Sequence, residues 1–170
     1  LTMNGKSQTG LVVCTSIDEY LDNTIKKHEL TRADKEKDRI RHVDILNANT
    51  GPIFLAYHRN EQVKSILHSI MKNQKAIYDF VSEDGVGHKV WLVSDKKDIS
   101  ELITLFEKIP SLYIADGHHR NASAVKVGLK RRATKPNYTG EEEFNYYLSV
   151  LFSDDELYIM DYNRVVKDLN

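Results

Sequence analysis

Short apolar runs alternate with longer amphipathic stretches along the whole chain. Gly10–Thr15 (GLVVCT), Ile53–Tyr57 (IFLAY) and Leu112–Ala115 are compact and rich in β-branched or aromatic residues, which predicts strands. Two further strands are predicted over Tyr146–Phe152 and Leu157–Asp161, joined by Ser-Asp-Asp-Glu. The pattern predicts a sheet whose strands are separated by helices.

Apolar residues recur at three- and four-residue spacing between these runs, which predicts helices. The second helix opens at Thr31-Arg-Ala-Asp34, which resembles a capping box with Asp in place of Glu or Gln. Ile25–Leu30 predicts a strand or an extended turn, and Lys75–Val81 with His88–Ser94 predicts a hairpin around Glu-Asp-Gly-Val-Gly. We therefore expect one α+β domain over residues 1–170, a mixed β-sheet flanked by helices. The predicted helices cover Ile17–Asn23, Thr31–Asn49, Asn60–Asn73, a stretch from Ser94 or Asp95 to just before Pro110, and His118–Lys130.

Composition is that of an ordinary globular protein. Hydrophobic residues make up 41% and charged residues 29% of the 170 residues, and the formal net charge of −1 disfavours nucleic acid as a partner. The one cysteine, Cys14, cannot form an internal disulfide, which favours the reducing cytoplasm, and its apolar neighbours predict a core position. No apolar run reaches the roughly 18 residues that span a membrane. The chain starts with LTMNG, and we expect it to be the central part of a longer protein.

Polar chemistry is concentrated in YIADGHHR, where a strand turns directly into a helix. The first N–H groups of a helix have no partner inside it, and together with the helix dipole they form an anion site. Gly117 allows close backbone approach, and His118 and His119 can donate to phosphate oxygens. The positive charge of Arg120 in the first turn is repelled by the positive end of the helix dipole, and a bound anion would offset this repulsion. A phosphate site is the favoured interpretation, and an ordinary Asp-Gly turn with exposed His and Arg side chains is the alternative.

Asp116 and the two histidines raise the question of a metal ion. Asp116 can cap the helix, orient a histidine or help to hold a magnesium ion. Zinc is disfavoured, because adjacent helical residues point about 100° apart and His118 and His119 therefore chelate one ion poorly. The sequence holds no H-E-x-x-H motif or Cys pair that would assist them.

A second concentration of chemistry is KKHELTRADKEKDR, residues 26–39. Glu29 lies among cations that favour its ionised form, so it is a candidate acceptor for a hydroxyl proton or a ligand for an ammonium group. Arg32, Lys35 and Arg39 share one helical face. A solvated helix with internal ion pairs is the alternative for this segment.

Four motifs together resemble one known family: MNGKSQTGL, IKKHELTRADKEKDR, NANTGPIFLAY and YIADGHHR. In this order, and over nearly the whole chain, they are similar to the bacterial family catalogued as domain of unknown function 1015. Members of that family are usually longer than this chain. Asn121 marks a departure, because an aromatic residue usually follows the family's histidine-arginine pair.

The DGHHR turn is also similar to the nucleotide loop of the ParB and sulfiredoxin superfamily. That superfamily includes CTP-dependent partition proteins, sulfiredoxin and kinases of free serine. The resemblance implies that Gly117, His118, His119 and Arg120 contact nucleotide phosphates, and that Asp116 acts near the metal or the transferred group.

The two resemblances imply a phosphotransferase that uses ATP, ADP or another nucleotide with Mg²⁺. Its expected substrate is a small hydroxy amino acid such as serine, or a phosphate ester such as phosphoserine. A nucleotide-binding regulatory module of ParB type and a phosphoester hydrolase are the alternatives. We expect no membrane contact, and a homodimer is compatible with the sequence. The candidate residues are Glu29, Asp116 and His119 for catalysis, Gly117, His118, His119, Arg120, Arg32 and Lys35 for the cofactor, Asp116 for the metal, and His28, Asn49 and Thr50 for the substrate.

Overall fold

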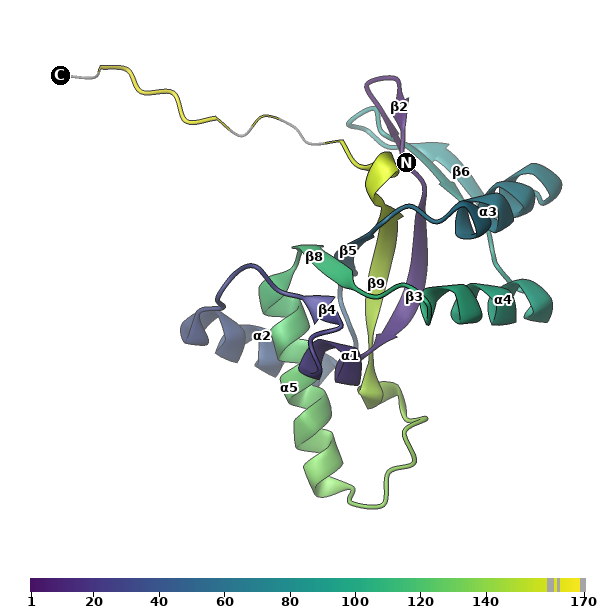
Figure 1. Ribbon diagram of the computed structural model, residues 1–170. Coiled ribbons are helices and arrows are strands. Elements are labelled where there is room, and N and C mark those ends of the chain that lie inside the picture. Colours follow the sequence, from purple (N-terminus) through teal and green to yellow (C-terminus); the bar gives the residue numbers. More distant parts are fainter. Residues whose placement is uncertain (159–160, 162, 169–170) are drawn as a thin grey trace.

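The computed structural model describes residues 1–158, 161 and 163–168, and a five-stranded mixed sheet lies at its centre (Figure 1). Antiparallel and parallel pairings alternate across it: β3 is antiparallel to β9, β9 is parallel to β5, β5 is antiparallel to β8 and β8 is parallel to β4. The predicted mixed sheet is therefore confirmed. In spatial order its strands are β3 (Gly10–Ser16), β9 (Tyr146–Ser153), β5 (Ile53–Tyr57), β8 (Leu112–Asp116) and β4 (Ile25–Lys26).

One face of this sheet carries the core and the other is largely open. Alternate strand residues such as Leu55, Ile114 and Tyr147 are fully or almost fully buried, as the two-residue period of a strand requires. On the opposite face, Val12 is 62% exposed and Cys14 is exposed as well. The prediction that Cys14 lies in the core is wrong, because β3 is an edge strand and Cys14 points to its open side.

Within the described residues, five α-helices accompany the sheet, in two groups (Figure 1). Their starts follow the sequence closely: Ser16, Asn60 and Asp95 each accept a hydrogen bond from a backbone N–H in the first turn of α1, α3 and α4. Two single turns of 3₁₀-helix precede and follow β9. The helices are α1 (Ile17–Leu21), α2 (Ala33–Leu46), α3 (Glu61–Asn73), α4 (Lys96–Phe106) and α5 (His118–Thr134), and the 3₁₀ turns are η1 (Glu143–Asn145) and η2 (Asp154–Glu156).

Helix α2 differs from its prediction at both ends. Its N-cap is Arg32, which makes no side-chain capping bond, and Thr31 donates its hydroxyl hydrogen to the Glu36 carboxylate instead of capping. The expected capping box is therefore wrong. The helix ends at Leu46 rather than Asn49, because Asn47 adopts a left-handed conformation with φ 50°.

A separate four-stranded antiparallel sheet has the order β2-β1-β7-β6. Its hairpin β6–β7 was predicted, with Gly85 at φ 80° in the turn, whereas the N-terminal hairpin β1–β2 was not. Of the segment Ile25–Leu30, only its first two residues form a strand. Leu157 and Tyr158 are not in a strand, and the rest of that expected strand includes residues 159 and 160, which lie outside the described residues. The strands of the four-stranded sheet are β1 (Thr2–Met3), β2 (Lys6–Ser7), β6 (Tyr78–Val81) and β7 (Gly87–Val90).

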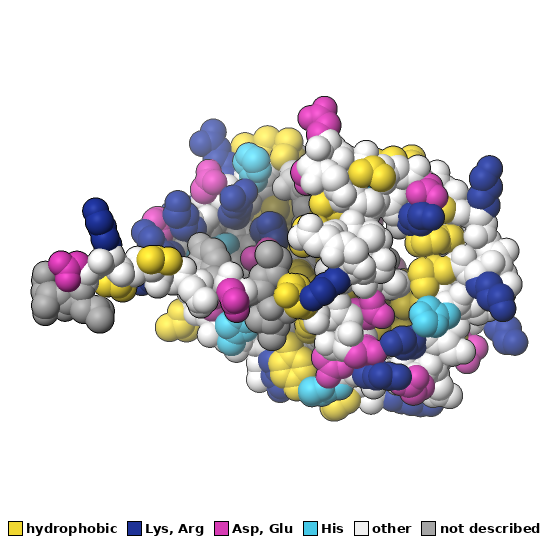
Figure 2. Space-filling view, turned by 90° about the horizontal axis from the view of Figure 1, so that it is seen from above, with side chains coloured by type: hydrophobic (Ala, Val, Ile, Leu, Met, Phe, Trp, Pro, Cys, Tyr) yellow, Lys and Arg dark blue, Asp and Glu magenta, His cyan; other side chains and the backbone are white. Residues whose placement is uncertain are grey.

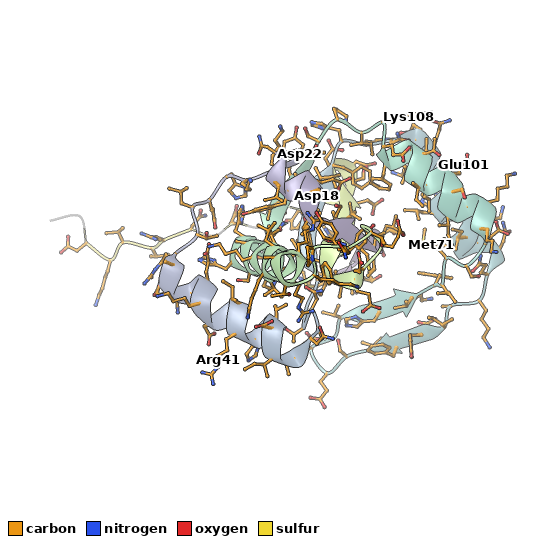
Figure 3. All side chains as sticks on the ribbon, turned by 90° about the horizontal axis from the view of Figure 1, so that it is seen from below. Asp18, Asp22, Arg41, Met71, Glu101 and Lys108 are labelled. Atoms are coloured by element: carbon orange, nitrogen blue, oxygen red, sulfur yellow. The ribbon has the colours of Figure 1, made fainter. Side chains whose placement is uncertain are left out.

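Helix α5 is the most deeply buried helix and positions the candidate site. It lies beside α2 (Figure 3), and its small residues let it approach both α2 and the sheet closely. At its far end, Arg132 donates two hydrogen bonds to Asp18 of α1, at 2.6 and 2.8 Å. Among the residues that the structure describes, no helix combines the length and apolar character needed to cross a membrane.

Candidate functional site

A pocket of about 230 Å³ lies where β8 ends and α5 begins. Its walls come from two segments far apart in the sequence, and parallel pairing of β4 with β8 brings them together: Ile25 is opposite Leu112 and Lys26 is opposite Tyr113. Because parallel strands end at the same edge of a sheet, the loop after β4 lies beside the turn after β8. The pocket is lined by Glu29, Arg39, Ala115, Asp116, Gly117, His118, His119 and Arg120.

The turn into α5 leaves the first N–H groups of the helix without a side-chain cap. Gly117 is the N-cap with φ 97° and ψ 27°, a left-handed conformation that other residues adopt only with strain. Asp116 does not cap the helix; its Oδ2 accepts a hydrogen bond of 2.7 Å from Nη2 of Arg120. This ion pair holds the Arg120 guanidinium over the turn, where a Cβ on Gly117 would lie 3.1 Å from Nε and Nη2. The structure thus presents backbone donors and a guanidinium at the same place.

His119 faces the start of α2. Its Nε2 accepts a hydrogen bond of 3.2 Å from the backbone N–H of Arg32, so a neutral ring carries its proton on Nδ1. The side chain of Arg32 pairs with Asp34 at 2.9 Å, and neither Arg32 nor Lys35 lines the pocket. Arg39 lines it instead. The signal that pointed to Arg39 was the helical face that it shares with Arg32 and Lys35.

His118 is buried against the loop after β4. It is 5% exposed, its ring centroid is 4.3 Å from that of His28, and its Nδ1 is 3.6 Å from Oε2 of Glu29. Burial lowers the pKa of His118 below its ordinary value and nearby His28 acts in the same direction, while the Glu29 carboxylate opposes them. Burial therefore favours the neutral form of His118.

Glu36 connects α2 to α5 behind the pocket. The residue is 6% exposed, and its carboxylate accepts hydrogen bonds from Lys126 and Thr31, which lower its pKa. Ser123 donates to the carbonyl of His119 at 2.7 Å. These bonds fix the start of α2, and with it Arg39, relative to α5.

The remaining candidates lie outside the pocket lining. Asn49 and Thr50 precede β5, which starts at the same edge of the sheet because Phe54 pairs with Asp116, but neither residue lines the pocket. Asn121 is fully buried, and its Nδ2 donates to the Tyr147 hydroxyl at 3.2 Å. Asn121 therefore belongs to the core, and its side chain is not placed to stack on a ligand.

The charges in the pocket nearly cancel. Arg39 and Arg120 bring two positive charges, and Glu29 and Asp116 bring two negative ones. The face of the molecule shown in Figure 2 also mixes cationic and acidic side chains.

The comparison with known proteins identifies the family of this chain but does not indicate an activity. The family model described as Protein of unknown function (DUF1015) matches residues 1–170. Neither a curated protein nor a solved structure matches the chain significantly.

Proposed function

Since the chain belongs to the family described as Protein of unknown function (DUF1015), its activity has to be inferred from its own residues, and we propose that it is a phosphotransferase. In this proposal it transfers a phosphoryl group between a nucleotide, ATP or ADP, and a small hydroxyl compound such as serine. The observation that carries the proposal is the uncapped start of α5 beside Arg120 and Arg39 in one pocket.

The start of α5 supplies what a phosphate group needs. Unpaired N–H groups and the positive end of the helix dipole favour an anion there, and α5 is long enough, at 17 residues, for a full dipole. Arg120 contributes its guanidinium, whose buried Nε has no hydrogen-bond partner among the described residues. Guanidinium groups bind phosphate by paired hydrogen bonds, so Arg120 and the helix start together form a phosphate subsite.

The size of the pocket limits what it holds. Small-molecule sites commonly enclose roughly 300–1,000 Å³. At about 230 Å³ this pocket suits one or two phosphate groups, with the nucleoside extending along the surface. We infer that this turn binds phosphate groups, as the corresponding turn of the ParB and sulfiredoxin superfamily does.

Phosphoryl transfer depends mainly on positioning and charge neutralisation, which suits this set of residues. Glu29 is 60% exposed and borders the pocket, so we assign it the role of accepting the hydroxyl proton of the substrate. Asp116 is 72% exposed and uses only Oδ2 for Arg120 among the described contacts, which leaves Oδ1 to hold Mg²⁺ with the phosphates. His28 borders Glu29 and is assigned to the substrate.

The exposed thiol of Cys14 fits a reducing compartment, and we propose the cytoplasm.

A turnover assay tests this proposal. The protein is incubated with ATP or ADP, Mg²⁺ and serine or phosphoserine, and the products are separated by chromatography. We expect Arg120→Ala and Glu29→Gln each to lower turnover at least about a hundredfold. Arg41→Ala is the matched control, because Arg41 points away from α2 into solvent (Figure 3).

The products decide among the alternatives. A phosphorylated acceptor supports the phosphotransferase, whereas free phosphate identifies a phosphoester hydrolase. Nucleotide binding without any product identifies a regulatory module. If Arg120→Ala turns over as fast as the wild type, the assignment of the phosphate subsite is wrong.

A further inference from the structure

A cluster of possible metal ligands adjoins the pocket, which two of its three residues, Glu29 and His118, also line. His28, Glu29 and His118 each offer one ligand atom, and these three atoms all lie within 4.8 Å of one another. Two of the side chains come from the loop after β4 and one from the first turn of α5. We propose that these three residues bind a divalent transition-metal ion of the zinc class.

The buried histidine is the first argument. His118 is 5% exposed, its Nε2 has no hydrogen-bond partner among the described residues, and its Nδ1 is too far from Glu29, at 3.6 Å, for a normal hydrogen bond. Buried polar groups usually have a partner. A neutral imidazole has one lone pair; with the proton on Nε2 it lies on Nδ1, the nitrogen nearest Glu29, and no hydrogen bond uses it, so Nδ1 is available as a ligand atom.

The distances are the second argument. Zinc holds nitrogen and carboxylate ligands at about 2.0–2.2 Å in a tetrahedron, which places the donor atoms roughly 3.3–3.6 Å apart. With one ligand atom from each residue, the three atoms all lie within 4.8 Å of one another. Nδ1 of His118 is 3.6 Å from one oxygen of Glu29, and Nε2 of His28 is 3.9 Å from the other. His28 and Glu29 are 59% and 60% exposed, so small side-chain rotations are enough to close the remaining gap.

The donor set is the third argument and selects the class of ion. Two imidazole nitrogens and one carboxylate oxygen are the ligands of open catalytic zinc sites, whereas Mg²⁺ and Ca²⁺ prefer oxygen alone. The objection to zinc from the sequence applies to His118 with His119, which are neighbours on one helix. That objection does not apply to His28 with His118, because His28 comes from a different segment of the chain.

The metal ion would supply positive charge for phosphate binding, a role that rests on the proposed function. The two arginines and two carboxylates of the pocket cancel, which is a weak attraction for a phosphate group. An ion with two positive charges at Glu29 and His118 makes the pocket net positive and leaves a fourth coordination position facing the phosphate. A carboxylate that ligates through one oxygen keeps the other to accept a proton, so Glu29 retains its assigned role.

Metal titration without nucleotide or substrate tests the site by itself. Zn²⁺ binding is measured calorimetrically on metal-free protein, and bound Co²⁺ is followed by its visible absorption, which reports tetrahedral nitrogen and oxygen ligands. We expect one ion per chain, and at least about a hundredfold weaker binding in His28→Gln and Glu29→Gln. Both positions are exposed, so these variants keep the fold. The matched control is His42→Gln, at an exposed histidine of α2, which should bind as the wild type does.

Two outcomes would overturn the site. Equal Zn²⁺ affinity in the wild type and His28→Gln would show adventitious binding elsewhere, and octahedral Co²⁺ spectra would show that the three residues do not form the site. Failure of the phosphotransferase proposal is separate: Arg120→Ala should keep the metal while losing turnover, and His28→Gln should lose the metal whether or not the protein turns over.

Discussion

Gly117→Ala tests the turn on which the phosphate subsite depends. Gly117 has φ 97° and is the N-cap of α5, so it sets the direction of the first N–H groups of that helix. A Cβ there would lie 3.1 Å from Nε and Nη2 of Arg120, which are the movable end of a side chain. The substitution therefore strains the backbone and displaces the guanidinium at the same time.

The two effects have different sizes. A left-handed conformation costs a non-glycine residue about 1–2 kcal/mol, and the smaller unfolded-state entropy of alanine returns about 0.4–1 kcal/mol. We expect a net loss of about 1 kcal/mol in the free energy of unfolding, or about 2–4 °C in Tm for a chain of this size. Each hydrogen bond to a charged group contributes about 1.5–3 kcal/mol, so losing one should weaken phosphate binding roughly ten- to a hundredfold.

Calorimetric titration with pyrophosphate measures the binding, and thermal unfolding measures the stability. Gly140→Ala is the matched control, because Gly140 has φ 102°, has open space around its Cβ position and lies in the loop between α5 and η1. Both variants should lose similar stability, but only Gly117→Ala should lose pyrophosphate affinity. Equal affinities in the two variants would refute the claim that the start of α5 binds phosphate.

Three further predictions concern the fold. Gly128→Ala should destabilise the protein by about 1–3 kcal/mol in urea unfolding, since the new Cβ would lie 2.5 Å from the backbone oxygen of Phe144; a stabilised variant would show that α5 and η1 separate easily. Hydrogen bonds from Lys64 and Ser153 lower the pKa of Asp155 to about 2, so its contribution, at most about 2 kcal/mol, is complete above pH 4 and is lost as the pH falls toward 2. The stability difference between wild type and Asp155→Asn should therefore shrink over that range, and a constant difference would contradict the cause given. Cys14 should react with a thiol reagent in the native protein, and reaction only after unfolding would place it in the core.

The elements of the candidate site were accessible from the sequence because their signals are local. Strand, Asp-Gly turn and helix follow one another within a few residues at 112–118, and the need for positive φ at Gly117 is a property of that turn alone. The prediction of a capping box at Thr31 is wrong because the motif has Asp in place of Glu or Gln, and because a buried carboxylate binds the Thr31 hydroxyl instead. Glu36 takes the hydroxyl hydrogen of Thr31, and it is buried only because α5 packs on α2.

By itself the sequence determined most of the strands and helices, the family, and the strand–turn–helix at residues 112–118, since each depends on residues close together in the chain. The tertiary structure alone decided which face of β3 is open, and so that Cys14 is exposed. It also decided that Glu29 and His28 meet His118, because parallel pairing of β4 with β8 joins segments about ninety residues apart, and no local pattern encodes that register. The two histidines that are neighbours in the sequence are unsuited to share an ion, whereas the two that the fold brings together have the spacing for it.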